Sequence, residues 1–284
     1  MKVIAYLWIA FLIAVPAASA QNQELVWAAD AEGGAPYTFP DPRNPAKIIG
    51  FEVDLANALA ARMGRTARFV QNQWDGLVPG LERGEYQVVI NGLEITPERA
   101  ERIHFSTPYF YSTLTMTTRL DDLRIQRAED LRGHTVGVLK VTFAEKYVRN
   151  LGGVTVRSYD SQVQPYIDLD LGRVDAVVMD TPIALYYATG PRVRNLELAS
   201  ARMSFGIGIR KSDDELLQQI NAAIDSLRRD GTLRKIYTDW GIYNAATAQT
   251  FGDRDPVTND NAVRYRDYLD AIRTERTFRE RLAQ

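Results

Sequence analysis

Residues Asn91 to Phe105 read Asn-Gly-Leu-Glu-Ile-Thr-Pro-Glu-Arg-Ala-Glu-Arg-Ile-His-Phe, and this stretch decides how the surrounding chain folds. The run before it, Tyr86 to Ile90, is short, apolar and rich in β-branched residues, which is typical of a buried parallel strand. Within the stretch, Thr96 is a good helix N-cap, and Pro97 suits the first helical position, where a missing N–H costs nothing. The pattern therefore predicts a strand, a capped turn and a short helix that carries Arg99 near its third position.

A small anion receptor follows from this arrangement. Asn91 and Gly92 end the strand at its carboxyl edge, and the helix cap directs the guanidinium of Arg99 back over them. Arginine suits an anion site because its planar fork meets a carboxylate with two parallel hydrogen bonds. The alternative is a surface arginine that forms an ion pair with Glu98, Glu101 or another exposed acid.

The N-terminus, Met1 to Ala20, has the pattern of a targeting segment. Lys2 is followed by an apolar run from Val3 to Val15 and then by the small residues Ala18-Ser19-Ala20. The apolar run is shorter than the ~20 residues that a spanning helix needs, so the pattern predicts a cleaved secretory signal rather than a membrane anchor. We therefore expect a periplasmic protein that begins at Gln21.

Composition excludes several classes of site. The chain has no cysteine, which excludes disulfides and thiolate metal sites in an exported protein. Its formal net charge of −2 gives no basis for a nucleic acid as partner. The histidines, His104 and His134, belong to no recognisable metal or catalytic spacing. We expect no cofactor, no metal and no catalytic residue, and a monomer large enough for two lobes of ~100 residues each.

Two successive α/β units follow from the hydrophobic pattern. In the first unit, strands are expected near residues 24–29, 67–70 and 86–90, with helices at 50–63 and 75–84 between them. In open α/β sheets, ligands lie at the carboxyl ends of the strands. Four polar or aromatic residues follow strands in this unit: Asp30, Trp74, Asn91 and Arg99. A proline- and glycine-rich stretch, 31–50, is expected to be a long binding loop.

The second unit repeats this order. Strands are expected at 134–139, 154–157 and 174–179, and helices begin near Thr142, at Gln162 and after Asp180. Amphipathic helices continue to Tyr243. From residue 244 to 284 the chain is polar and charged, and 261–281 has the spacing of an accessory helix.

Six motifs, in this order, resemble the periplasmic solute-binding proteins for polar amino acids (bacterial extracellular solute-binding protein family 3). These proteins are the receptor components of amino-acid ABC importers, and the resemblance covers roughly residues 25–241. The motifs are Gly50-Phe51-Glu52-Val53-Asp54-Leu55-Ala56, Trp74-Asp75-Gly76-Leu77-Val78-Pro79, Ile95-Thr96-Pro97-Glu98-Arg99, Phe105-Ser106-Thr107-Pro108-Tyr109, Gly172-Arg173-Val174-Asp175-Ala176 followed by Asp180, and Asp230-Gly231-Thr232-Leu233 to Trp240-Gly241.

The resemblance implies a two-lobe clamp of two open α/β lobes, joined by two extended hinge segments near Thr118 and Gly206. Lobe one would comprise residues 21–118 and 209–243, and lobe two residues 119–208. The charged extension, 244–284, would lie outside the clamp. An amino acid would bind in the cleft between the lobes and pass to the membrane permease of the importer.

The resemblance also implies roles for individual residues. Arg99 matches the arginine that binds the ligand carboxylate, and Thr142 matches a position whose hydroxyl and backbone N–H add donors. Asp180 matches the acid that binds the α-ammonium, although the residue before Thr181-Pro182 could also be a plain helix cap. The carbonyl of Gly92 or Asn91 would be a further ammonium acceptor.

Trp74 matches the aromatic residue that covers the ligand side chain, with core packing as the alternative. Asp30 matches an acid near that side chain. Tyr37 lies in a loop that departs from the family pattern. Glu94 stands where the family usually has a small residue, so it could contact a cationic ligand or neutralise Lys140 or Arg99.

Three functions fit this pattern. The first is capture and delivery of a small polar amino acid or close analogue. The second is a dehydratase of cyclohexadienyl substrates on the same fold, with Glu94 as general acid; the sequence shows no second catalytic partner for it. The third is a ligand-sensing module that passes closure to a partner protein.

Overall fold

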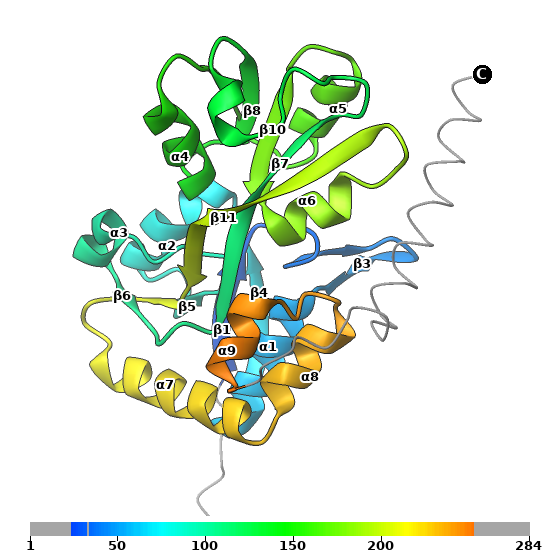
Figure 1. The fold of residues 1–284 in the computed structure, drawn as a ribbon. Helices are drawn as coiled ribbons and strands as arrows, with labels where there is room; N and C mark the ends of the chain where they lie inside the picture. The colour runs from blue at the N-terminus through cyan, green and yellow to red at the C-terminus, as the bar shows by residue number, and fades with distance from the viewer. Residues whose placement is uncertain (1–23, 33, 253–284) are drawn as a thin grey trace, which may run out of the picture.

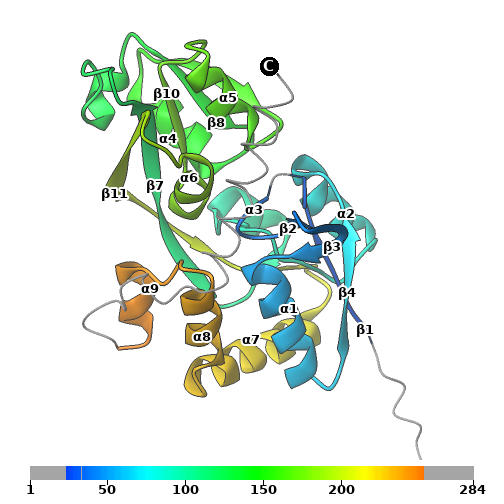
Figure 2. The same ribbon diagram turned by 90° about the vertical axis from the view of Figure 1, so that its right-hand side faces the viewer.

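Two sheets flanked by helices form two lobes, one above the other in Figure 1 and again distinct in Figure 2. The computed structural model describes residues 24–32 and 34–252. The expected signal segment, 1–20, and the expected accessory helix, 261–281, lie outside the described residues. The predicted fold class, two open α/β lobes joined by extended segments, is confirmed.

The first sheet contains short strands in the order β4-β1-β5-β12-β6. β1 pairs in parallel with β4 and β5, whereas β12 is antiparallel to β5 and β6. The strands are β1 (Glu24–Ala29), β4 (Thr66–Gln71), β5 (Val88–Val89), β6 (His104–Phe105) and β12 (Gly208–Ile209). Their helices are α1 (Phe51–Arg62), α2 (Leu77–Arg83), α3 (Pro97–Arg102), α7 (Asp214–Arg229) and α8 (Thr232–Asp239).

Helices cover both faces of this sheet. Trp27 and Leu55 share one buried cluster, on the side of α1, α7 and α8. Ala28 and Leu77 share a second cluster with Leu81 of α2. Because neighbouring residues of a strand point to opposite faces, the two clusters lie on the two sides of β1. This covering of both faces is why the strands read as continuous apolar runs.

The second sheet has the order β11-β7-β10-β8-β9. β8 is parallel to β9 and β10, and β7 is antiparallel to β10 and β11. The strands are β7 (Phe110–Arg119), β8 (Thr135–Leu139), β9 (Thr155–Tyr159), β10 (Ala176–Asp180) and β11 (Val193–Phe205). The helices are α4 (Phe143–Leu151), α5 (Gln164–Asp170) and α6 (Thr181–Tyr187), and two 3-10 turns lie at Trp74–Gly76 and Ala128–Leu131.

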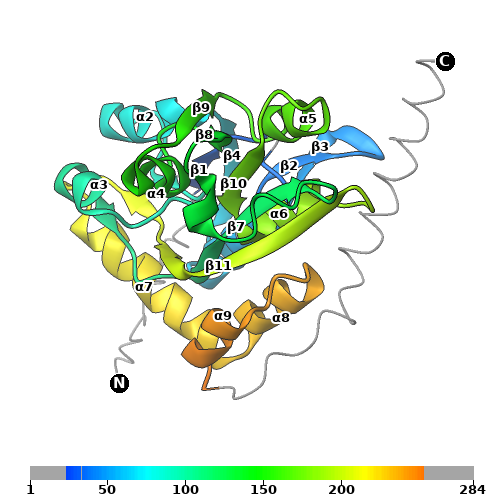
Figure 3. The same ribbon diagram turned by 45° about the horizontal axis from the view of Figure 1, so that its top comes forward.

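Two long strands connect the lobes. β7 and β11 run side by side from the first lobe into the second, and Figure 3 shows their passage along the molecule. Phe110 pairs with Phe205 at one end and Arg119 with Val193 at the other. Residues Leu114 to Thr118 already pair with β10 of the second sheet. The exact division of the chain between lobes stays a prediction.

The helix cap that the sequence predicts is confirmed. The side-chain oxygen of Thr96 accepts a hydrogen bond from the backbone N–H of Arg99 at 3.3 Å, and Pro97 opens α3. The prediction of a long loop at 31–50 is wrong for the second half of this stretch. Residues Phe39–Asp41 (β2) and Asn44–Ile49 (β3) form a hairpin, which the four prolines of this stretch had concealed.

The C-terminal extension begins with a short helix, α9 (Ala245–Thr250). The Asn244 side chain caps it by accepting from Thr247 N at 2.8 Å and donates to the carbonyl of Tyr111 at 2.9 Å. This helix therefore packs against β7. Within residues 24–32 and 34–252, no helix has the length and apolar character to cross a membrane.

Candidate functional site

A small cavity lies between the lobes. Seven of the nine predicted site residues line it: Tyr37, Trp74, Asn91, Gly92, Glu94, Thr142 and Asp180. The other lining residues are Leu139, Ala144, Gln162, Met179 and Ile183. The cavity volume is about 20 Å³, which is room for about one water molecule. An amino acid could therefore enter only if the lobes move apart.

Asp30 lies beside the cavity and does not line it. Its carboxylate accepts hydrogen bonds from the backbone N–H groups of Trp74 at 3.0 Å and Glu32 at 2.9 Å. Its own N–H donates to Asn91 Oδ1 at 2.8 Å. Asp30 thus holds Trp74 and Asn91 in place at the strand ends.

Gly92 is held by a buried acid that sequence reasoning left without a role. Its N–H donates to Glu52 Oε1 at 2.6 Å, and the Tyr109 hydroxyl donates to the same oxygen. Gly92 has φ +55°, and a Cβ there would lie 3.0 Å from Tyr37 Cε1, so glycine is required. Burial raises the pKa of Glu52 to about 7, although these two donors oppose the shift. The position of Glu52, in the first turn of α1 and within the first motif, was the available signal.

Glu94 and Arg99 form the centre of the contact between the lobes. Glu94 Oε2 accepts from Arg99 Nη1 at 2.5 Å, and Arg99 Nη1 also donates to the Glu94 carbonyl at 3.0 Å. Glu94 Oε1 accepts from the backbone N–H of Phe143, the first residue of α4, at 2.9 Å. One side chain of the first lobe therefore binds both Arg99 and the helix N-terminus of the second lobe. The sequence alternative in which Glu94 neutralises Arg99 is confirmed.

Three further contacts close the cleft around this pair. Arg99 Nη2 donates to the carbonyl of Val141 at 2.9 Å, and the guanidinium lies 5.2 Å from the ring centroid of Trp74. Trp74 Nε1 donates to the carbonyl of Lys140 at 3.1 Å. We expected the Thr142 hydroxyl to donate a hydrogen bond to the ligand. Its hydrogen is already engaged, because the hydroxyl donates to Leu139 O at 2.7 Å and accepts from Glu145 N.

Asp180 has few partners. It occupies the N-cap position of α6, but its side chain makes no capping hydrogen bond. Instead, the Tyr37 hydroxyl donates to Asp180 Oδ2 at 3.4 Å. Burial raises the pKa of Asp180 well above its usual range, and the charge of Glu94 raises it further. Among the described residues, no lysine or arginine forms an ion pair with Asp180. A buried carboxylate without an ion-pair partner either becomes protonated or takes up a cation.

Gln162 was missed by sequence reasoning. It lines the cavity from the segment before α5, and its Oε1 is buried without a hydrogen-bond partner. An unpartnered buried acceptor in a cavity is unusual, because such groups are nearly always paired. Its place three residues after the end of β9, at the carboxyl edge of the sheet, could have pointed to the site.

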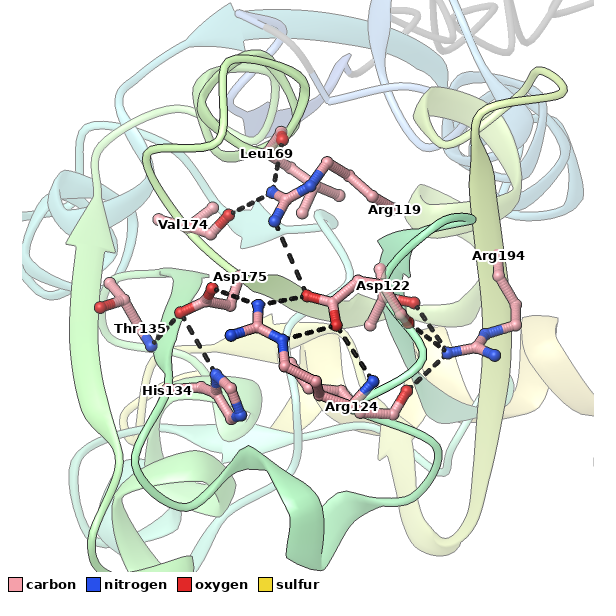
Figure 4. A network of polar contacts seen from close by, with 11 residues as sticks. Arg119, Asp122, Arg124, His134, Thr135, Leu169, Val174, Asp175 and Arg194 are labelled. Atoms are coloured by element: carbon pink, nitrogen blue, oxygen red, sulfur yellow. Dashed lines mark hydrogen bonds and ion pairs between the residues drawn. The ribbon is translucent and has the colours of Figure 1, made fainter.

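A second charged cluster lies in the second lobe outside the cavity (Figure 4). Asp122 accepts from Arg124 at 2.6 Å and lies 3.7 Å from Arg119. Asp175 accepts from Arg124 at 3.3 Å, and its other oxygen lies 3.5 Å from His134 Nδ1. Among the described residues, no group of histidines and acids could hold a metal ion. This cluster joins the end of β7 to β8 and β10.

Comparisons with known proteins agree with this architecture. Residues 26–242 match the bacterial extracellular solute-binding proteins, family 3. The chain is 35% identical to the L-cystine-binding protein TcyJ of Escherichia coli K12 over 209 residues, which are 72% of this chain and 78% of TcyJ. It is 32% identical over 204 residues to the ABC transporter arginine-binding protein 1 of the same strain, with 68% and 82% of the two chains covered.

Solved structures show the same similarity. An ancestral arginine-binding protein bound to arginine has a TM-score of 0.71 and 34% identity, and the match covers 76% of this chain and 97% of that one. AncCDT-1, an ancestral amino acid-binding protein that is a precursor of cyclohexadienyl dehydratase, has a TM-score of 0.71 and 32% identity, with 76% and 95% covered. The chain therefore belongs to the bacterial extracellular solute-binding proteins, family 3.

Proposed function

We propose that the chain captures a small polar amino acid or close analogue between its lobes and delivers it to the permease of an ABC importer. The observation that carries this proposal is Asp180, a cavity carboxylate with the Tyr37 hydroxyl as its hydrogen-bond donor and, among the described residues, no ion-pair partner; the charge of Arg99 acts on it, but the Arg99 guanidinium donates to Glu94. An ammonium or guanidinium group binds such a carboxylate through charge-assisted hydrogen bonds. The cavity needs no covalent chemistry for this task.

The family and the names of the relatives support the proposal. The E. coli relatives bind L-cystine and arginine, and the arginine-binding protein belongs to an ABC transporter. Proteins of this kind act outside the cytoplasm, and the N-terminal segment 1–20 is consistent with export. We therefore propose that this chain is a periplasmic receptor, and we expect it to act as a monomer.

Closure of the lobes would couple binding to delivery. Contacts between the lobes are made by Trp74 to Lys140, by Arg99 to Val141 and by Glu94 to Phe143. A ligand stabilises the closed form only to the extent that it binds that form better than the open form. A ligand that spans Asp180 and first-lobe groups such as Trp74 would have this preference. The sensing function uses the same clamp with a different partner protein.

The dehydratase alternative has less support. In the sequence, this alternative depends on Glu94 as a general acid. AncCDT-1, an amino acid-binding protein, is a precursor of such an enzyme. Both carboxylate oxygens of Glu94 accept hydrogen bonds, one from Arg99 and one from Phe143 N–H. A proton donor would have to give up one of these contacts. The relatives named above are binding proteins.

A substitution at Asp180 tests the proposal. The protein from Gln21 onward would be screened by thermal shift against the twenty amino acids and their decarboxylated amines, and the hits measured by calorimetry. We expect Asp180→Asn to weaken the best ligand about 100-fold or more, because an ammonium loses its buried counter-charge. Asp170→Asn, an exposed acid at the end of α5, is the matched control and should bind normally. Equal affinity of the Asp180→Asn variant and the intact protein would refute the proposal.

A further inference from the structure

The cavity contains a carboxylate receptor that the chain itself fills. Glu94 is 2% exposed, and its two oxygens accept from Arg99 Nη1 and from Phe143 N–H. Arg99 comes from α3 and Phe143 from the first turn of α4, so donors of both lobes converge on one carboxylate. A guanidinium and a helix N-terminus are the two groups that bind carboxylates best. Glu94 satisfies both.

Three of the five N–H donors of Arg99 are used within the chain. Its Nη1 donates to the Glu94 carbonyl at 3.0 Å, its Nη2 donates to the Val141 carbonyl at 2.9 Å, and its plane lies against Trp74. A second carboxylate at this position would meet Glu94 at close range in a site with little water. The two negative charges would repel each other strongly there. A ligand carboxylate could bind only after displacing Glu94, which would then be a buried acid without a partner.

Two other groups that line the cavity lack hydrogen-bond donors or cationic partners. Asp180 has the Tyr37 hydroxyl at 3.4 Å and no cationic partner among the described residues, and Gln162 Oε1 has no donor. Apolar side chains also line the cavity, among them Leu139, Met179 and Ile183. The cavity therefore offers acceptors for N–H groups and an apolar wall for a methylene stem, together with a carboxylate receptor that is already occupied.

We propose that the carboxylate of Glu94 replaces the α-carboxylate of a ligand, and that the cleft selects small organic cations without a carboxylate. This inference rests on the proposed function, since it names the ligand class of the same site. The preferred ligands are amines or guanidines of the size of a decarboxylated cationic amino acid. Their cation binds Asp180, and a second nitrogen, where present, donates to Gln162. Glu94 is a specificity-determining residue that keeps its contacts with Arg99 and Phe143 while the ligand is bound.

Matched pairs of ligands test this inference. Calorimetry would compare agmatine with arginine, cadaverine with lysine and histamine with histidine on the intact protein. We expect at least one amine to bind about 10-fold or more tightly than its amino acid. An amino acid that binds as tightly as its amine, or more tightly, in every pair would overturn the inference while leaving the proposed function standing. Failure of all six ligands, together with failure of the wider screen, would overturn both.

The variant Glu94→Ser then shows which group sets the preference. Serine removes the internal carboxylate and frees Arg99 and Phe143 N–H for a ligand carboxylate. We expect the ratio of amine to amino-acid affinity to fall by about 10-fold or more, mainly because the amino acid gains affinity. An unchanged ratio in a folded variant would overturn the inference.

Two further variants serve as a substitute and a control for this experiment. Glu94→Gln keeps the size of the side chain and removes its charge, so it should shift the ratio in the same direction if Glu94→Ser does not fold. Glu101→Gln neutralises an exposed acid on the same helix, α3, and should leave the ratio unchanged. Circular dichroism would confirm that each variant is folded. A ratio that changes equally in Glu101→Gln would show a general charge effect and overturn the role of Glu94.

Discussion

Asp122 and Asp180 are both carboxylates beside the second sheet, yet their pKa values move in opposite directions. Hydrogen bonds from Arg124 lower the pKa of Asp122 to about 2. Burial, with the nearby charge of Glu94, raises the pKa of Asp180 well above its usual range. Burial alone therefore does not decide in which direction the pKa of a carboxyl group moves. The hydrogen-bond donors and charges around each carboxyl group decide it. Arg119 and Arg124 pair with Asp122, whereas Asp180 has no ion-pair partner among the described residues.

The two regions also differ in how they are assembled. Asp122 is bound by Arg119, the last residue of β7, and by Arg124, two residues after Asp122 in the chain; Figure 4 shows both guanidinium groups directed at its carboxylate. The cleft brings together Tyr37, Glu94 and Asp180 from separate elements of both lobes. The first cluster can persist when the lobes move, whereas the second exists only when they meet.

The largest effect on stability is expected at Asp122, which pairs with Arg119 and Arg124. Asp122→Asn should lower the free energy of unfolding by about 2 to 3 kcal/mol, because the charged hydrogen bonds to Arg124 are lost in a buried position. Ligand affinity should not change, since Asp122 lies outside the cavity. Urea denaturation would measure the loss, with Asp121→Asn, an exposed neighbour, as control. An equal loss in both variants would remove the distinction between the two regions.

This contribution should depend on pH in a defined way. The pKa of Asp122 in the folded state, about 2, lies below the ordinary value of 3.8. The stabilisation is therefore fully present above pH ~4 and is lost as the pH falls through ~2. Denaturation curves of the intact protein and Asp122→Asn should converge in that window.

The second effect has the opposite sign. Asp180→Asn should raise the free energy of unfolding at pH 7 by on the order of 1 kcal/mol, because a neutral amide replaces an acid whose charged form is disfavoured there. Because the pKa of Asp180 is higher in the folded state than its ordinary value of 3.8, the penalty falls progressively as the pH drops below the folded pKa and is absent below pH ~4. The gain should therefore shrink on acidification. A loss of stability at pH 7 would show that Asp180 is structurally paired, like Asp122.

The smallest effect on stability is expected from the backbone conformation at Val141, in the loop beside the cleft. The turn next to His134 has its positive φ at Gly133, whereas the cleft loop has Val141 at φ +59°. A β-branched residue in this conformation is strained, and Val141 is 59% exposed, so little packing is lost on its removal. Val141→Gly should raise stability by about 0.5 kcal/mol, the relief of strain less the entropy of glycine. Val141→Ala keeps the Cβ and should gain less; an equal gain would show that strain is not the cause.

Local features of the chain were predictable from the sequence. Thr96 and Pro97 begin α3 as expected, because an N-cap and a proline at the first position act within four residues. The two-lobe fold and most of the cavity-lining residues also followed from the motifs. The β2–β3 hairpin did not, since its prolines resemble a loop. The role of Glu52 was missed because its partners, Gly92 and Tyr109, are distant in sequence.

The sequence by itself determined the family, the α/β order and the presence of Glu94, Arg99 and Asp180 at strand or helix ends. Only the tertiary structure decided which of these groups are satisfied. Arg99 could bind a ligand or an acid of the chain, and the approach of Phe143 from the other lobe selects Glu94 as its partner. Asp180 could cap a helix or bind a cation, and the absence of a capping bond leaves it for the cavity. Such outcomes depend on donors that meet only after the lobes have folded and closed.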